Sequence, residues 1–330
     1  MKIISGLRLI FLSLGLLAVG VVHAQPFPGK TIQYIIPFPT AADSDLVARY
    51  QAELSAKKYN QQMVVINRAG AGGALAWSQL NSYPADGLTV VGVNIPHIIL
   101  QPLQEGIQFK TEDINSIYFY HFTPDALMVS ADSPYKTFQD LVAAAKKDPG
   151  KVSLAGSALY SANHMAVERL NKAVGIKTEY IAFKGTGDLI TSLIGMHVDG
   201  AMGYLPLAIQ QKGKVRTLAI AAEKRHPALP DVPTFKELGI NWVDGAYRGV
   251  GVPKSTPKPI QQKLSDYFAL LNSDPEIKKK LEDAGFVLVD IPLSKMPAFM
   301  KEKTAQAMDD AKNAGMIKYG SYYCFTYLPK

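Results

Sequence analysis

Residues Thr31–Tyr59 read "TIQYIIPFPTAADSDLVARYQAELSAKKY" and indicate the fold class. The stretch opens with a near-continuous apolar run of the length of a β-strand. After the loop "PFPTAADSD", the residues Leu46, Tyr50 and Leu54 fall on one face of a helix. A buried strand followed by a helix with one apolar face is the repeating unit of α/β proteins.

The same alternation continues along the chain. Further strands are expected in "MVVINRA", "LTVVGVN", "VSLAG", "TEYIAF", "VRTLAIAA" and "YRGVGVP", and helices lie between most of them. The sequence therefore predicts an α/β fold of mostly parallel sheets covered by helices on both faces. Ligands of such sheets bind beyond the carboxyl ends of the strands, so the loops at those ends are the candidate sites.

Residues 1–24 have the features of a cleavable secretory signal. Lys2 and Arg8 precede an apolar run that ends at Val22, and small residues stand before the expected cleavage point. The run is short for a membrane span of about 20 residues. We expect export and cleavage after Ala24.

Charge and cysteine content narrow the class of protein. The net charge is +7, but the basic residues are scattered rather than interleaved with aromatic residues in a stripe, which argues against a nucleic-acid partner. Cys324 is the only cysteine, so an exported chain of this length must rely on a large core rather than an internal disulfide. The histidines have no metal-ligand spacing, and we expect neither a metal nor a cofactor.

Two loops carry the candidate chemistry. In the first, Pro37–Asp45, either Asp43 or Ser44 can cap the following helix. The free N–H groups at that helix start can equally hold an anionic ligand group. The second loop, "GSALYSANH", starts a later helix and places Ser161 and His164 three residues apart, which suits capping and ligand contact.

Catalysis and dinucleotide binding have weaker support. The second loop lacks the G-x-S-x-G pattern of a serine nucleophile, so we expect no catalytic residue there. His164 has a further interpretation as a structural histidine bonded near the helix start. Gly70-x-Gly72 follows a strand, but Leu75 stands where the dinucleotide pattern needs Gly or Ala, which favours tight backbone packing.

Taken together, the chain resembles one family. The blocks "PFPTAADSDLVAR", "VVINRAGAGGALA", "SANHM", "FKGTGDLITSLIGMHVD" and "KRHPALPDVPTFKELG" follow in order the pattern of the Bug or TctC receptors, the solute-binding proteins of tripartite tricarboxylate transporters. The resemblance implies a two-lobed periplasmic binding protein of the Venus-flytrap type. It places the first lobe at residues 25–124 and 227–330 and the second lobe at 125–226.

The resemblance also implies a function. The protein is expected to be a non-enzymatic periplasmic receptor for an organic or aromatic carboxylate or an amino acid, which it delivers to a membrane permease. A ligand sensor and a secreted enzyme on the same scaffold are the alternatives. The candidate ligand-binding residues are Phe38, Pro39, Thr40, Ala41, Ala42, Asp43, Asp45, Ser157, Ala158, Leu159, Tyr160, Ser161, His164, Lys184, Gly185, Tyr204 and Arg248.

The chain departs from the family pattern in both loops. Ala41 and Ala42 replace two glycines, which predicts a remodelled first loop because alanine resists positive φ. Tyr160 replaces another glycine, and we expect its ring in the cleft. Asp43 adds a negative charge, so Arg248 or Lys184 is expected to neutralise a ligand carboxylate. Arg248 has the alternative role of a surface or interlobe salt bridge.

Overall fold

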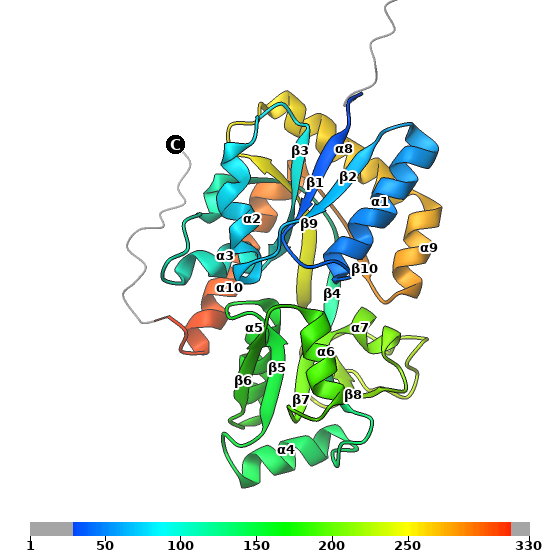
Figure 1. Cartoon of the computed structure of the whole chain (residues 1–330). Helices are drawn as coiled ribbons and strands as arrows, with labels where there is room; N and C mark the ends of the chain where they lie inside the picture. The colour runs from blue at the N-terminus through cyan, green and yellow to red at the C-terminus, as the bar shows by residue number, and fades with distance from the viewer. Residues whose placement is uncertain (1–28, 318–330) are drawn as a thin grey trace, which may run out of the picture.

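The computed structural model describes residues 29–317 and has two lobes, each built on a β-sheet with helices on both faces (Figure 1). In Figure 1 the first lobe lies above the second, which is drawn in green. Within these residues no helix is both long and apolar enough to cross a membrane. The predicted signal peptide and the aromatic segment Tyr319–Pro329 lie outside the described residues.

The sheet of the first lobe has the strand order β2-β1-β3-β9-β4, with β10 also paired to β4. Its strands are β1 (Ile32–Ile36), β2 (Met63–Asn67), β3 (Thr89–Ile95), β4 (Ile114–Ser130), β9 (Gly245–Pro253) and β10 (Val287–Pro292). All seven residues of β3 are buried, as expected for a central strand covered on both faces.

Within residues 29–317, six helices cover this sheet in two layers. They are α1 (Asp43–Tyr59), α2 (Ala74–Gln79), α3 (His97–Leu100), α8 (Lys258–Ser273), α9 (Pro275–Asp283) and α10 (Met296–Asn313). Val47 of α1, Phe268 of α8 and Ile277 of α9 share one core cluster. Trp77 of α2 and Ala307 of α10 belong to another cluster, so the sheet separates two apolar layers.

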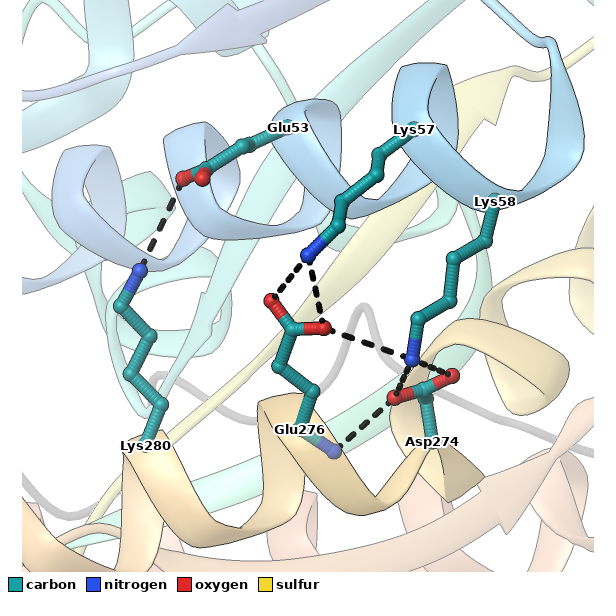
Figure 2. A network of polar contacts seen from close by, with 6 residues as sticks. All are labelled: Glu53, Lys57, Lys58, Asp274, Glu276 and Lys280. Carbon is teal, nitrogen blue, oxygen red and sulfur yellow. Dashed lines mark hydrogen bonds and ion pairs between the residues drawn. The ribbon is translucent and has the colours of Figure 1, made fainter.

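Charged side chains join α1 to α9 at the surface (Figure 2). Lys58 Nζ lies 2.8 Å from Asp274 Oδ1, and Lys57 Nζ lies 3.2 Å from Glu276 Oε2. Lys280 Nζ extends the network to Glu53 at 3.6 Å. Most of these side chains are exposed, so the pairs add little stability individually.

The second lobe is a smaller sheet covered by four helices. Its strands are β5 (Ser153–Ser157), β6 (Glu179–Phe183), β7 (Gly200–Tyr204) and β8 (Val215–Ile220), and its helices are α4 (Phe138–Lys147), α5 (Ala162–Val174), α6 (Thr186–Ile194) and α7 (Leu205–Gln210). Helix α4 begins where it does because Thr137 Oγ1 accepts a bond from Asp140 N at 3.2 Å. Helix α5 ends at Gly175, which takes the left-handed φ of 63° that favours glycine.

Strand β4 belongs to both sheets (Figure 1). It pairs with β9 as far as Pro124 and with β7 from Asp125 onward. On the return path, Phe235 and Trp242 pack in the core of the second lobe. The division of the chain into lobes stays a proposal, and these contacts favour a second boundary near Asp244 rather than after residue 226.

Both sheets are mixed, whereas the sequence predicted mostly parallel ones. β1 pairs in parallel with β2 and β3, and β5 with β6 and β7. However, β9 and β10 run antiparallel to β4, as do β7 and β8. The antiparallel pairing of β4 and β9 follows from their roles as connections. The chain leaves the first lobe along β4 and returns to it along β9, so these two strands run in opposite directions.

Candidate ligand-binding site

The two lobes enclose a small cavity at the carboxyl ends of their strands. It is lined by Phe38, Pro39, Ala42, Asp43, Ser44, Asn94, His97 and Arg248 from the first lobe and by Ser157, Gly185 and Tyr204 from the second. The space open to the centres of water molecules is about 20 Å³, enough for about one water. With the lobes in this arrangement, the space is too small for an organic ligand.

A buried ion pair lies in the cavity wall. Arg248 Nη2 is 3.3 Å from Asp43 Oδ2, and both residues are less than a tenth exposed. The Arg248 guanidinium lies over the Tyr204 ring of the other lobe, 4.9 Å from the ring centre. Burial raises the pKa of Asp43, and the nearby Arg248 charge opposes that rise. Arg248 and Lys184 were expected to neutralise a ligand carboxylate. Only Arg248 is among the lining residues of the cavity, and it is paired there with Asp43.

Four buried polar atoms around this cavity have no hydrogen-bond partner among the described residues. They are Asn94 Oδ1, His97 Nδ1, Tyr204 Oη and Arg248 Nε. Such a group costs roughly 1–3 kcal/mol when it stays unsatisfied. Their convergence on one cavity from both lobes indicates a place built for a polar ligand or ordered water.

Asn94 and His97 line the cavity but were not among the residues expected from the sequence. Asn94 lies in β3 opposite Arg248 on the neighbouring strand, and His97 begins α3. Burial, with a smaller effect of the Arg248 charge, lowers the pKa of His97 to about 3, so its imidazole is neutral at physiological pH. The sequence signal for Asn94 is its place at the carboxyl end of the expected strand "LTVVGVN".

Three predicted residues of the first loop hold the loop together rather than line the cavity. Thr40 Oγ1 bonds Asn67 Oδ1 at 3.4 Å, and Asp45 Oδ2 accepts a bond from Ala41 N at 2.9 Å. Burial raises the pKa of Asp45, but bonds from Arg49, Ala41 N and Asn67 outweigh it and lower the pKa. The N-cap of α1 is Ala42 without a side-chain bond, so the predicted capping by Asp43 or Ser44 was wrong; both lie inside the first turn.

In the second loop, two predicted residues have structural roles. Ser161 caps α5, because its Oγ accepts a bond from His164 N at 3.2 Å. The His164 ring stacks on Tyr180 at 4.1 Å, and its Nδ1 accepts a bond from Tyr160 N at 3.2 Å. Burial lowers the pKa of His164 to about 4. These contacts match the structural interpretation of His164.

Tyr160 does not line the cavity, which differs from the sequence-based expectation. Its hydroxyl donates to the Met316 carbonyl of the first lobe at 3.2 Å. Its ring packs against the core cluster that contains Trp77 and Met165. The Tyr160 ring can pack there because this apolar cluster contains residues of both lobes.

The remaining predicted residues lie at the mouth of the cleft. Ala158, Leu159 and Lys184 line an open groove outside the cavity, together with Pro39. Lys184 is exposed in that groove and lies outside the inner cavity lining. Across the cleft, Gln101 Nε2 donates to the Leu159 carbonyl at 3.1 Å.

Three non-glycine residues of the two loops have a left-handed backbone. Ala41 has φ of 66°, Ala158 has 49° and Tyr160 has 54°. The expectation that alanine would force a different loop shape was therefore wrong at Ala41. The loop retains left-handed φ because the bond from Ala41 N to Asp45 fixes it.

The family model described as the tripartite tricarboxylate transporter family receptor, TctC, matches residues 47–315. The chain belongs to this family. Members of the family are periplasmic binding proteins, which are receptors rather than enzymes. The family and the two-lobed α/β fold expected from the sequence are thus confirmed.

Relatives and solved structures agree with this assignment. The UPF0065 protein in the gbd 5'region of Cupriavidus necator is 32% identical over 263 residues, which cover 78% of this chain and 80% of the relative. The structure of the periplasmic binding protein BugD matches with a TM-score of 0.80 and 27% identity, covering 88% of this chain and 99% of BugD. R. palustris Rpa4515, solved with adipate, matches with a TM-score of 0.81 and 25% identity, covering 88% of this chain and 98% of Rpa4515.

Within residues 29–317, the structure gathers no group of three or more His, Cys, Asp or Glu side chains in position to hold a metal ion. The polar groups of the cavity are instead one carboxylate, one guanidinium, a neutral imidazole, an amide and hydroxyls.

Proposed function

We propose that this TctC-family receptor captures a small carboxylate-bearing ligand between its lobes in the periplasm and delivers it to the permease of a tripartite tricarboxylate transporter. The observation that carries the proposal is the convergence of unpartnered buried polar atoms from both lobes on one cavity. The family assignment and the adipate bound to Rpa4515 support a carboxylate. Export with cleavage after Ala24 is part of the proposal.

Lobe closure is the mechanism we propose. Gly185 of the second lobe lies against the Pro39 ring of the first, where a Cβ would stand 3.3 Å from Cγ. With the Gln101–Leu159 bond, such contacts exist only when the lobes are together. A ligand that touches Arg248 and Tyr204 adds contacts from both lobes to this arrangement, so it shifts the population toward closure.

No catalytic role is proposed for the cleft. The Ser161 hydroxyl and the His164 imidazole accept bonds from backbone N–H groups at the start of α5. A ligand held by buried polar groups and released on opening needs no bond making or breaking.

The test begins with the mature protein from Gln25. Its ligand is released by denaturation and identified by mass spectrometry, and a panel of carboxylates is screened by thermal unfolding. A ligand at 100 times its Kd should stabilise the fold by about 2.7 kcal/mol. Arg248→Met should weaken binding by roughly tenfold or more if Arg248 makes a charged hydrogen bond.

The matched control is Lys224→Met, which removes an exposed cation that is not among the lining residues of the cavity. Its ligand affinity should equal that of the wild type. Equal affinity in the Arg248 variant, or a released ligand without a carboxylate, would contradict the proposal.

A further inference from the structure

We infer that the ligand carries a protonated amine as well as a carboxylate, so that the receptor selects amino acids over plain dicarboxylates. The inference rests on the proposed binding function and adds the role of Asp43 as the residue that determines this choice. It follows from the charges and the unpartnered acceptors on the cavity wall.

The charge balance of the cavity disfavours a dicarboxylate. Among the described lining residues, Asp43 and Arg248 are the charged side chains, and they already neutralise each other. His97 is neutral, and burial raises the pKa of the Tyr204 phenol, which keeps it neutral too. Two added negative charges would therefore face Asp43 across a poorly hydrated space, where like charges repel strongly. An amino acid with one carboxylate adds no net charge, and an acidic amino acid adds one negative charge where the dicarboxylate adds two.

The available donors and acceptors suit a zwitterion. Arg248 Nε has no partner in the structure and can donate to a ligand carboxylate. The bond from Arg248 Nη2 engages one oxygen of the Asp43 carboxylate, Oδ2. Asn94 Oδ1 is a buried acceptor without a partner, and neutral His97 has an unpartnered Nδ1.

An ammonium group supplies what these acceptors need. It carries three N–H donors, and Asp43, Asn94 and His97 offer it a carboxylate oxygen, an amide oxygen and an imidazole nitrogen. A plain dicarboxylate has no donor at neutral pH, so it would leave Asn94 Oδ1 unsatisfied. Asn94 and Arg248 are opposite each other on neighbouring strands, which places the acceptor and the carboxylate-binding donor side by side.

The experiment compares ligands that differ only in the amine. The mature protein, unfolded and refolded to remove bound ligand, is titrated calorimetrically at pH 7.5 with L-aspartate against succinate, L-glutamate against glutarate, and L-2-aminobutyrate against butyrate. For the pair that fits the cleft, we expect the amine-bearing member to bind at least about tenfold tighter, the usual effect of one charged hydrogen bond.

Asp43→Asn tests the assigned residue, because it removes the charge and keeps the size. We expect the amine-bearing ligand to bind at least about tenfold more weakly and the plain acid to bind more tightly. Asp132→Asn is the control: Asp132 is exposed in the second lobe and outside the cavity lining. It makes the same change in net charge and should alter neither affinity.

The outcomes separate this inference from the proposed function. Tighter binding of succinate or glutarate than of its amine-bearing partner, or a co-purified ligand without an amine, overturns the inference and supports the receptor function. Absence of both a co-purified ligand and any binding in the panel overturns the proposed function and the inference with it. If Asp43→Asn does not fold, the wild-type comparison decides alone.

Discussion

At the scale of single residues, both loops of the cleft hold non-glycine residues in a left-handed backbone. This conformation costs an L-residue about 1–2 kcal/mol, and it persists where surrounding bonds fix it. Ala158 N donates to the Phe183 carbonyl at 2.8 Å, and Tyr160 N donates to His164 Nδ1 at 3.2 Å. These two bonds hold the left-handed backbone at positions that have no glycine.

We predict that Ala41→Gly stabilises the mature protein by about 1 kcal/mol in urea unfolding. Ala41 has φ of 66° and an exposed side chain, so glycine removes strain and loses little packing. Ala42→Gly is the matched control, because Ala42 has φ of −67° and gains nothing from glycine. Equal changes at both positions would show that the left-handed backbone at Ala41 stores no strain.

Asp125 is a buried carboxylic acid whose ionisation should affect stability. It is buried where β4 passes between sheets, and Oδ1 has no partner among the described residues. Burial, and then the Asp244 charge, raises its pKa well above 3.8, against the opposing charges of Arg169 and Arg248. The pKa of Asp125 is higher in the folded protein than in the unfolded chain. The protonated Asp125 carboxyl therefore contributes its full stabilisation of the fold below about pH 3.8, and this contribution is lost as pH rises through the folded-state pKa.

Asp125→Asn should therefore be more stable than the wild type at pH 7.5, by at least about 1 kcal/mol, since one pKa unit corresponds to about 1.4 kcal/mol. The advantage should shrink toward pH 4. Urea midpoints across this range measure it. Exposed Asp132→Asn should show no such trend, and a constant difference for Asp125→Asn would refute the titration argument.

At the scale of elements, local periodicity predicted most strands and helices but not how they pair. The strand expected at "YRGVGVP" is β9, and the helix expected from Asp45 is α1, which begins at Asp43. The antiparallel direction of β9 and the double membership of β4 depend on partners more than 100 residues apart in the chain, such as Phe122 and Tyr247. No window of 10 to 20 residues contains that information.

The candidate site divides in the same way. Four of the residues expected at the site line the cavity: Asp43, Gly185, Tyr204 and Arg248. Two others do not, because Tyr160 packs in a core cluster and His164 stacks on a neighbouring ring. The position of His164 in the sequence does not reveal that its ring stacks on Tyr180.

An ion pair joins helices α5 and α10. Arg169 of α5 bonds Asp310 of α10 and also donates to Asp244 Oδ2 at 2.8 Å, so one side chain joins the second lobe to the first. A double-mutant cycle with Arg169→Met and Asp310→Asn should give a coupling energy of about 1–3 kcal/mol, because the pair is partly buried. The same cycle on the exposed pair Arg225 and Glu237 should give under about 1 kcal/mol. Equal couplings would mean that the bridge between lobes is no stronger than a surface pair.

At the scale of the whole molecule, the two lobes should unfold as one unit. They share β4, and the cluster around Trp77 includes Met165 of the second lobe. The sequence contains two tryptophans, and the structure places Trp77 in the core of the first lobe and Trp242 in the core of the second. Each lobe therefore has its own fluorescent reporter.

We predict that both reporters follow the same transition. In the single-tryptophan variants Trp77→Phe and Trp242→Phe, the urea midpoint from fluorescence should equal the midpoint from circular dichroism of the same variant. Leu141→Ala, which removes core volume from the second lobe and should cost about 2–5 kcal/mol, should also lower the midpoint reported by Trp77. A Trp77 transition that stays in place while the Trp242 transition moves would mean that the lobes unfold independently. Strand β4 would then be a simple linker, and ligand-driven closure would have to come from the ligand's own contacts rather than from cooperation between the lobes.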